Sequence, residues 1–547
     1  MTKERYNIGH NSIIVKFYLL ITIIIILAWA PVLFVPFIND DIQILRYNTS
    51  KSLLTILKPF WSSDVSIYYW RPLGNIIHPL ILLLCGFHPF PFRLVSLIFY
   101  ILFILVFFYS ELKLKMNIKI AALFAIIFSL LPSHELQVAW IAEQGEILLA
   151  IFLVLSFLFY CDAYEEEKVS TKKLIISALF FIASLLLKEL AFTGIFIPVV
   201  AFFAKKNEHK ITIKKVIKHA GIGLVALMLI LLYRYFVIGG TPFSSPNFSG
   251  SRPIKWIINF FIYIPLSFLP PEALERIQFY SHHFIGITAI IILTIFFVFF
   301  VVRTFLKINS VKRNYIIAAI LWYVIFVLPA LFALMRWYVF IASIGLLWAI
   351  ALIFEYYWDR LRFKKIFLVL ISFLFIYLMI YNFSIMGKWV TVGNKFEIAL
   401  ASIKKYKPDI EADSILIWAL PDKIERIPMM KLGVQQSIQW ALNNNSEVDS
   451  PLRAELINNQ SKIRFEKESD TSFVFYLTGG RFMPYNGMSK SIIKNENISF
   501  SEGAVYFKIK TYISKGVAKS IAKISLSKKL PNVKQFYFDG NRFVMIN

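Results

Sequence analysis

The sequence predicts an α-helical polytopic membrane protein with a small C-terminal external domain of the α/β or α+β class. Of its 547 residues, 58% are hydrophobic and the mean hydropathy is +0.66, whereas soluble domains are about 45–50% apolar. Apolar runs of about 20 residues, enough to cross a bilayer, recur along the first part of the chain. The rest is polar and rich in lysine, so we place a membrane domain at 1–388 and an external domain at 389–547.

About eleven of the apolar runs are predicted to be transmembrane helices. Lysine and arginine gather in alternate connections, as at 205–218 and 360–365. By the positive-inside rule these connections and the N-terminus are cytoplasmic. An odd number of spans puts the C-terminal domain on the extracytoplasmic side, and we expect the bacterial inner membrane. The predicted spans are 13–35, 91–112, 119–133, 145–162, 173–187, 190–204, 216–236, 284–304, 315–332, 336–357 and 365–386.

The net charge of +25 and the two cysteines exclude other classes of protein. The basic residues fall between apolar spans and form no single patch, which argues against a nucleic-acid partner. Cys85 and Cys161 lie in or beside apolar segments. They therefore predict neither a disulfide framework nor a metal site.

The C-terminal segment alternates short apolar runs with turn residues. The runs SILIWALP, SFVFYLTGG and AVYFKIK predict β-strands, and KFEIALASIKKY has helical spacing. In QFYFDGNRFVMI, Asp539 and Gly540 separate two aromatic runs, which predicts a β-hairpin.

Ionisable residues gather in the predicted outer loops, at the boundaries of apolar spans. A charge buried within a span costs about 2.5–3.5 kcal/mol on insertion scales, so such residues usually pair or serve a function. The first outer loop, about 36–91, is long for a membrane protein and holds two adjacent aspartates. The candidate site residues are Asp40, Asp41, Arg71, His134, Glu135, Lys188, Glu189 and Arg336.

Each candidate has a chemical and a structural interpretation. Paired aspartates can act as a general base or hold a divalent metal, and they also suit a solvated helix end. Arg71 can grip a phosphate through two parallel hydrogen bonds, or extend to the membrane interface. His134 and Glu135 could cap a span, and Arg336 could anchor one. Lys188 and Glu189 are adjacent and cannot share a helical face, so we expect them to have different partners.

The order of these motifs resembles the GT-C superfamily of polytopic glycosyltransferases, which use polyprenyl-phosphate sugars. The branch that it resembles most is that of the protein O-mannosyltransferases and the membrane half of the TMTC mannosyltransferases. The resemblance covers about 13–389. The motifs are DD, WRPL (70–73), GFHPFPFRLVSLIFY (86–100), PSHELQVAWIAEQGEILLA (132–150), and finally KEL (188–190) with RWYVFIAS (336–343).

The resemblance implies transfer of a sugar from a polyprenyl-phosphate donor to a hydroxyl of a protein, lipid or glycan, with inversion, on the extracytoplasmic face. It implies that Asp40 or Asp41 is the general base and that Arg71, Lys188 and Arg336 neutralise the phosphate. His134, Glu135 and Glu189 would complete substrate binding. The resemblance implies no cofactor beyond the lipid-linked donor and no strict need for metal, although a divalent ion would fit Asp40 and Asp41.

Departures from the family pattern keep other functions open. The family's Glu, Arg and Asp of the second outer loop fall here on Leu136, Gln144 and Glu146. A flippase or transporter for a lipid-linked sugar would need the same cations, although it predicts charges near span centres. A non-catalytic membrane scaffold is the other alternative. A polysaccharide polymerase or ligase fits less well, because the long outer loop here is the first one.

Overall fold

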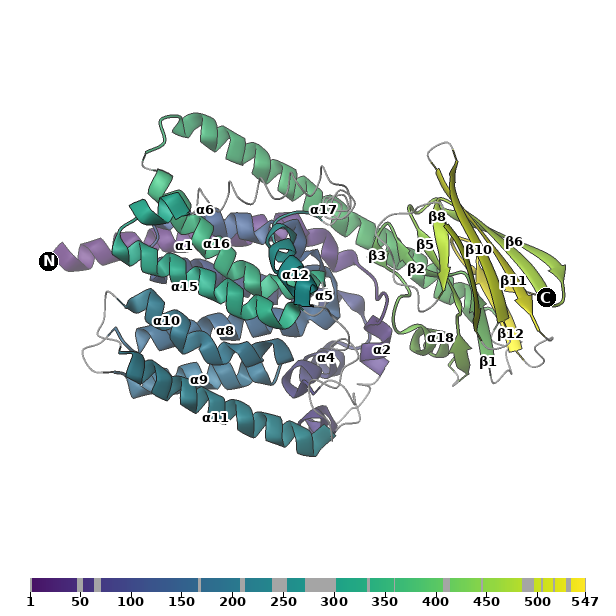
Figure 1. Cartoon of the computed structure of the whole chain (residues 1–547), viewed down its shortest axis with the longest axis horizontal. Helices are drawn as coiled ribbons and strands as arrows, with labels where there is room; N and C mark the ends of the chain where they lie inside the picture. Colours follow the sequence, from purple (N-terminus) through teal and green to yellow (C-terminus); the bar gives the residue numbers. More distant parts are fainter. Residues whose placement is uncertain are drawn as a thin grey trace. The chain divides into compact units, whose positions relative to one another are not determined.

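The computed structural model describes residues 2–46, 53–62, 70–165, 169–206, 212–238, 253–270, 302–331, 335–358, 360–406, 414–443, 446–484, 496–502, 505–514, 517–527 and 533–546. The chain is mostly helical up to residue 404 and mostly β after it (Figure 1). Its contacts form two units. Unit 1 comprises 1–30, 50–86 and 91–384, and unit 2 comprises 31–49, 87–90 and 385–547.

The long helices of the chain are apolar over most of their length, as the hydropathy pattern predicts. Asn117 and Asn309 begin two of them, α6 and α15, and their side chains accept hydrogen bonds from the amides of Lys119 and Lys312. The helices are α1 (Thr2–Trp29), α5 (Pro89–Lys113), α6 (Ile118–Ser129), α8 (Gln144–Asp162), α9 (Thr171–Leu185), α10 (Ile197–Lys205), α11 (Ile213–Ile238), α12 (Pro253–Leu266), α15 (Ser310–Val327), α16 (Val339–Trp358) and α17 (Lys364–Lys404).

Seven helices in the described part of the chain are long and apolar enough to cross a membrane, or eight if one bent pair counts as a span. These helices make the chain an integral membrane protein. The predicted count of about eleven spans is not confirmed. The run 119–133 became that bent pair, since α6 and the helical segment after it meet at 51°. The predicted spans 173–187 and 190–204 correspond to the shorter helices α9 and α10. The predicted span 284–304 lies almost entirely outside the described residues.

Within unit 1 the helices pack closely around aromatic and small side chains. Helix α8 packs against α9 and α10, and α15 packs against α10 and α16 (Figure 1). Gly345 permits the approach of α16 to α15, because a Cβ at this position would overlap the backbone of Ala319 and Tyr323. Larger side chains could not occupy this crossing without moving a helix.

Short helices in the connections carry most of the candidate site residues. Pro72 is the first residue of α4, and Gly86, with φ of 73°, ends it. The short helices are α2 (Asp41–Arg46), α3 (Leu53–Ile56), η2 (Lys58–Phe60), α4 (Pro72–Cys85), η3 (Pro132–His134), α7 (Glu135–Ala139), η4 (Ile141–Glu143), η5 (Glu189–Phe196), η8 (Leu328–Ala330) and η9 (Arg336–Tyr338), with η1 (Ala30–Phe34) following α1.

The C-terminal part of unit 2 is a β domain of three sheets, with strand orders β13-β12-β1-β4, β6-β7-β11-β10-β9 and β3-β2-β5-β8. One short helix, α18 (Val434–Leu442), follows β3. The strands are β1 (Ser414–Trp418), β2 (Leu420–Ile424), β3 (Ile427–Pro428), β4 (Glu447–Asp449), β5 (Leu452–Leu456), β6 (Lys462–Ser469), β7 (Ser472–Thr478), β8 (Gly480–Pro484), β9 (Glu496–Glu502), β10 (Val505–Ser514), β11 (Val517–Leu526), β12 (Val533–Phe538) and β13 (Phe543–Ile546).

The predicted strands and hairpin of this domain are confirmed. Strands β1 and β7 lie in the predicted runs, β10 begins in one and continues to Ser514, and β12 pairs with β13 around Gly540, whose φ is 110°. Most of the described residues after α17 are in strands, and the helix α18 lies among them. The apolar alternation identifies individual strands but does not reveal how many short polar strands lie between them.

Candidate active site

The start of α4 brings Arg71 to the connection between α9 and η5. Arg71 precedes Pro72, and the amide of Leu73 donates to the carbonyl of Leu186 at 3.1 Å. The two segments are close here, since a Cβ on Gly74 would lie 3.6 Å from the carbonyl oxygen of Leu187, an ordinary contact distance. Backbone pairing therefore sets Arg71 beside the residues that follow Leu187.

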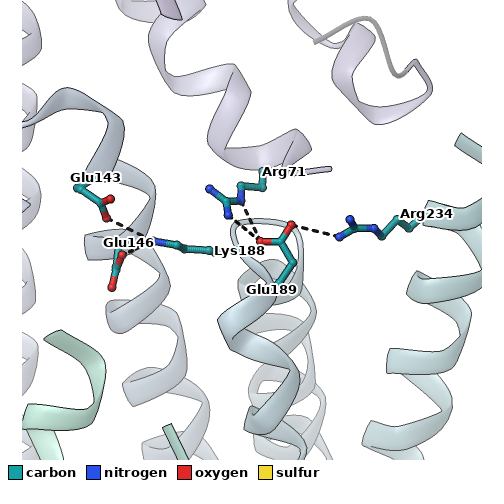
Figure 2. Close-up of polar contacts among 6 residues, drawn as sticks. All are labelled: Arg71, Glu143, Glu146, Lys188, Glu189 and Arg234. Atoms are coloured by element: carbon teal, nitrogen blue, oxygen red, sulfur yellow. Dashed lines mark hydrogen bonds and ion pairs between the residues drawn. The ribbon is translucent and has the colours of Figure 1, made fainter. Parts of the chain in front are cut away.

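Arg71 and Arg234 share the carboxylate of Glu189 (Figure 2). Arg71 donates from Nε at 3.0 Å and from Nη2 at 2.8 Å to Oε2 of Glu189. Arg234 of α11 donates from Nη1 to Oε1 at 3.1 Å. The Arg234 side chain is buried, whereas 29% of the Arg71 side chain is exposed. One carboxylate thus orients two guanidinium groups from separate helices.

Lys188 points away from Glu189, toward the start of α8 (Figure 2). Its backbone is extended, with φ of −162° and ψ of 148°, because the chain leaves α9 before η5 begins. Its ammonium contacts Glu146 and lies 3.4 Å from Oε2 of Glu143. The prediction that Lys188 and Glu189 have different partners is confirmed.

Together these side chains form a cluster of three cations, Arg71, Lys188 and Arg234, and three carboxylates, Glu143, Glu146 and Glu189; we call it the ion cluster. Four of the six are at least nine-tenths buried as whole residues. Burying an unpaired charge has a large free-energy cost, and ion pairing with an opposite charge offsets part of that cost.

Three members of the ion cluster, Lys188, Arg71 and Glu189, keep their charges at neutral pH. Burial alone would lower the pKa of Lys188, but Glu143 and Glu146 raise it above the ordinary value. Burial would likewise lower the pKa of Arg71, and Glu189 raises it instead. Burial would raise the pKa of Glu189, but Arg71 and Arg234 bring it below the ordinary value. The cluster therefore presents fixed cations rather than titrating groups.

A neighbouring ion pair joins α7 to η9. Arg336 donates from Nη2 to Oε2 of Glu135 at 3.2 Å, and 30% of the Arg336 side chain is exposed. The rings of Trp140 and Trp337 meet edge to face with centroids 5.8 Å apart. Tyr338, also in η9, lies under the Lys188 ammonium at 5.3 Å. Segment 336–338 thus connects the Arg336–Glu135 pair with the ion cluster.

His134 lies in an aromatic enclosure. Its ring packs edge to face on Phe128 and Phe340, and Nδ1 lies 2.8 Å from the hydroxyl of Tyr100. The residue is fully buried. A part for His134 in substrate binding stays a prediction.

Asp40 and Asp41 belong to unit 2, where residues of the β domain contact their segment. Asn39, at a positive φ of 59°, donates its amide to the carbonyl of Met429 at 3.0 Å, and its Oδ1 accepts from the amide of Leu432 at 2.9 Å. Asp41 is buried at the start of α2 and accepts from the amide of Ile38 at 3.0 Å. Asp40 is half-buried and accepts from Nδ2 of Asn39 at 3.0 Å.

Gly433 completes this contact. A Cβ on Gly433 would lie 2.9 Å from the Cα of Asp40, and its φ of +67° suits glycine. We call residues Met429–Gly433 the holding loop. The two aspartates therefore differ, since Asp41 is buried and accepts from the backbone, whereas Asp40 is half-buried.

Sequence reasoning did not identify Glu143 and Arg234, and it treated Glu146 only as a departure from a family pattern. Arg234 had a usable signal, because it is a charge inside an apolar run. Glu143 and Glu146 are three residues apart at the start of α8, which places both near one face. Among the described residues, no group of three or more His, Cys, Asp or Glu side chains could hold a metal ion.

Comparisons with known proteins assign the chain to no family. No protein-family model matches the sequence, and no curated protein matches it. Among solved structures the chain is similar to the crystal structure of ArnT from Cupriavidus metallidurans bound to undecaprenyl phosphate. The identity is 12%, the match covers 80% of this chain and 86% of that chain, and the TM-score is 0.39. A TM-score this low does not establish a shared fold.

Proposed function

We propose that the protein is a GT-C-type membrane glycosyltransferase that moves a sugar from a polyprenyl-phosphate donor to an acceptor hydroxyl. The acceptor is a protein, lipid or glycan, and the reaction inverts the anomeric carbon. The ion cluster is the observation that carries this proposal. Two of its cations, Lys188 and Arg234, are buried and the third, Arg71, is partly exposed, and all three lie near the ends of helices in an integral membrane protein.

A phosphate attached to a lipid is the ligand that suits such cations. Arg71 presents a planar set of five N–H donors, which matches phosphate oxygens two at a time. Its side chain is partly exposed, as is that of Arg336. Because the polyprenyl chain remains in the bilayer, the donor's phosphate lies near the ends of transmembrane helices, where these residues lie in the sequence.

The carboxylates of the ion cluster serve to hold the cations in position. Glu189 keeps Arg71 and Arg234 oriented, and Glu143 with Glu146 holds Lys188. Cations fixed in advance stabilise developing charge without reorganising during the reaction. Phosphate leaves as a dianion, so it gains negative charge in the transition state, which these cations stabilise.

In the proposed reaction the acceptor oxygen forms a bond to the anomeric carbon while the bond from that carbon to the phosphate oxygen breaks. The bonding electrons leave on the polyprenyl phosphate. The proton of the acceptor hydroxyl passes to a carboxylate, which we assign to Asp40. Asp40 is half-buried, whereas Asp41 is buried and accepts a hydrogen bond from the amide of Ile38. A base of this kind contributes about 10²–10⁴-fold.

The remaining roles follow the same logic. Arg336 and Glu135 are connected to the ion cluster through η9. The proposal includes no divalent ion at Asp40 and Asp41, because the buried Asp41 carboxylate already accepts from the amide of Ile38. We further propose that the protein resides in a bacterial inner membrane, with its N-terminus in the cytoplasm and its β domain outside. This orientation rests on the distribution of lysine and arginine.

A transfer assay tests the proposal. The full chain in nanodiscs receives a panel of radiolabelled polyprenyl-phosphate sugars, with a membrane extract from the source cells as acceptor. We expect label in a product other than the donor, and a loss of about 10²-fold or more in Asp40→Asn. Asp41→Asn is expected to lower the unfolding temperature as well, whereas Asp449→Asn, an exposed aspartate of unit 2, serves as the matched control and leaves transfer unchanged.

Transfer by Asp40→Asn at the wild-type rate would contradict the assignment of the base. An absence of transfer from every donor, with polyprenyl phosphate still bound, would favour a flippase.

A further inference from the structure

The β domain has an open groove of about 880 Å³ over the five-stranded sheet. Its floor is the solvent-facing side of four adjacent strands, β6, β7, β11 and β10. The pairing registers place Lys462, Thr478, Lys519 and Tyr512 in one row across these strands. In the next row Tyr476 lies between Arg464 and Ile521. The walls are loops at 459–461 and 539–541.

Two tyrosines give the floor of the groove apolar rings that each end in a polar hydroxyl. Tyr476 and Tyr512 both line the groove and are half-buried, so part of each ring faces outward. Aromatic rings of this kind pack against flat apolar surfaces while the hydroxyl keeps a polar partner. The C–H faces of sugar rings are such surfaces. Asn459, Gln460 and Asn541 add amide donors and acceptors along the walls.

The charged side chains of the groove favour a ligand with negative charge. Among the groove-lining cations, Arg464 pairs with Glu466 at 2.6 Å, and Lys395 bonds to the carbonyls of Asn459 and Gly540. Lys462 and Lys519 have no ion pair with any residue that the structure describes. They are two strands apart, about 10 Å by sheet geometry. A ligand with anionic groups along its length would bridge them.

The surroundings extend this positive surface. Lys508 and Lys510 of β10 are exposed on the same side of the sheet as Tyr512. Lys523 of β11 is also on this side, and it pairs with Glu468 at 2.7 Å. The excess of cations would attract an anionic ligand from solution and would disfavour a neutral one.

We propose that this groove binds an anionic glycan, an oligosaccharide that carries carboxylates or phosphates. Its rings lie on Tyr476 and Tyr512, and its charges meet Lys462 and Lys519. If the proposed sugar transfer is correct, this glycan is the acceptor or part of it. That last step rests on the proposed function, whereas the binding does not.

A binding measurement on the full chain tests the proposal. The protein is held in nanodiscs of zwitterionic lipid and titrated calorimetrically with tetragalacturonate, which is acidic, and with maltotetraose, which is neutral and of equal length. We expect tetragalacturonate to bind and its affinity to fall as salt is added. The double variant Lys462→Ala with Lys519→Ala is expected to raise Kd about fivefold or more, as for two partly exposed ion contacts.

Tyr476→Ala probes the aromatic floor separately, and it is expected to weaken binding at every salt concentration. Lys534→Ala, a lysine of β12 outside the groove, is the matched control and is expected to leave Kd unchanged.

Four results would overturn the proposal. In the first two, the protein binds both sugars equally well, or it binds neither. In the third, none of the groove variants weakens binding. In the fourth, the protein binds vesicles of anionic lipid and no sugar. None of these measurements requires sugar transfer. A result that overturns glycan binding therefore leaves the proposed transferase activity untouched.

Discussion

The ion cluster and the Asp40–Asp41 segment are stabilised in different ways. The ion cluster depends on side chains, with three cations and three carboxylates from separate segments of unit 1. The Asp40–Asp41 segment depends on the backbone of the holding loop, which contacts Asn39 from about 390 residues further along the chain. A change in one charge should therefore disturb the ion cluster strongly, whereas the aspartate segment should respond to backbone changes.

The largest effect is expected from Lys188→Met, which leaves Glu143 and Glu146 buried without their cation. Breaking a buried pair costs about 3–5 kcal/mol of unfolding free energy. Adding Glu143→Gln and Glu146→Gln should restore most of this stability, since no uncompensated charge remains. Transfer should stay low in the triple variant, because the cation is still absent. Thermal unfolding and donor transfer are measured on the wild type, on Lys188→Met and on the triple variant.

Lys312→Met is the matched control for this series. Lys312 pairs with Glu355 at 2.9 Å in unit 1, but it is 30% exposed. Its loss should cost about 1 kcal/mol or less. Wild-type transfer by the triple variant would mean that Lys188 has a structural role only.

Smaller effects are expected where the holding loop meets Asn39. Asn39→Gly keeps the positive φ but removes the side-chain hydrogen bonds, and Asn39→Ala adds backbone strain. Gly433→Ala places a Cβ against Asp40. We expect losses of about 1–3 kcal/mol for the two alanine variants, with a lower kcat and an unchanged KM for the donor. Asn39→Gly should lie between them and the wild type.

An increase in the donor KM with kcat unchanged would contradict this reading, because it would assign the segment to donor binding. If neither alanine variant folds, the same comparison is made on Asn39→Gly: a change in kcat supports this interpretation, and a change in the donor KM contradicts it.

The smallest effect is expected from pH. The pKa of Glu189 is lowered below 4.5, so its contribution to stability is present above that value and is lost as pH falls through the lower, folded pKa. The pKa of Lys188 is raised above 10.5, so its contribution is lost only as pH rises through the higher value. The difference in unfolding temperature between wild type and Glu189→Gln should stay constant from about pH 5 to pH 10. A slope near neutral pH would show that another group controls the ion cluster.

The sequence predicted those features that depend on local pattern. Apolar runs located most of the long helices, and the Asp539–Gly540 turn located the hairpin. It could not predict that Arg234 shares Glu189 with Arg71, because that contact depends on how three helices pack. The contact between Asn39 and Leu432 was equally hidden, since nothing in either local sequence specifies a partner so far along the chain.

The most direct test of the central claim is whether the ion cluster binds the donor's phosphate. Polyprenyl monophosphate and the matching polyprenol, which lacks the phosphate, are titrated against the full chain in nanodiscs. The control is Arg313→Lys, at an arginine that donates to the carbonyl of Ile308. We predict that Arg71→Lys weakens binding of the monophosphate about tenfold, because the two-pronged contact is lost. Polyprenol binding and the control should not change. Equal affinity of wild type and Arg71→Lys for the monophosphate would contradict the account.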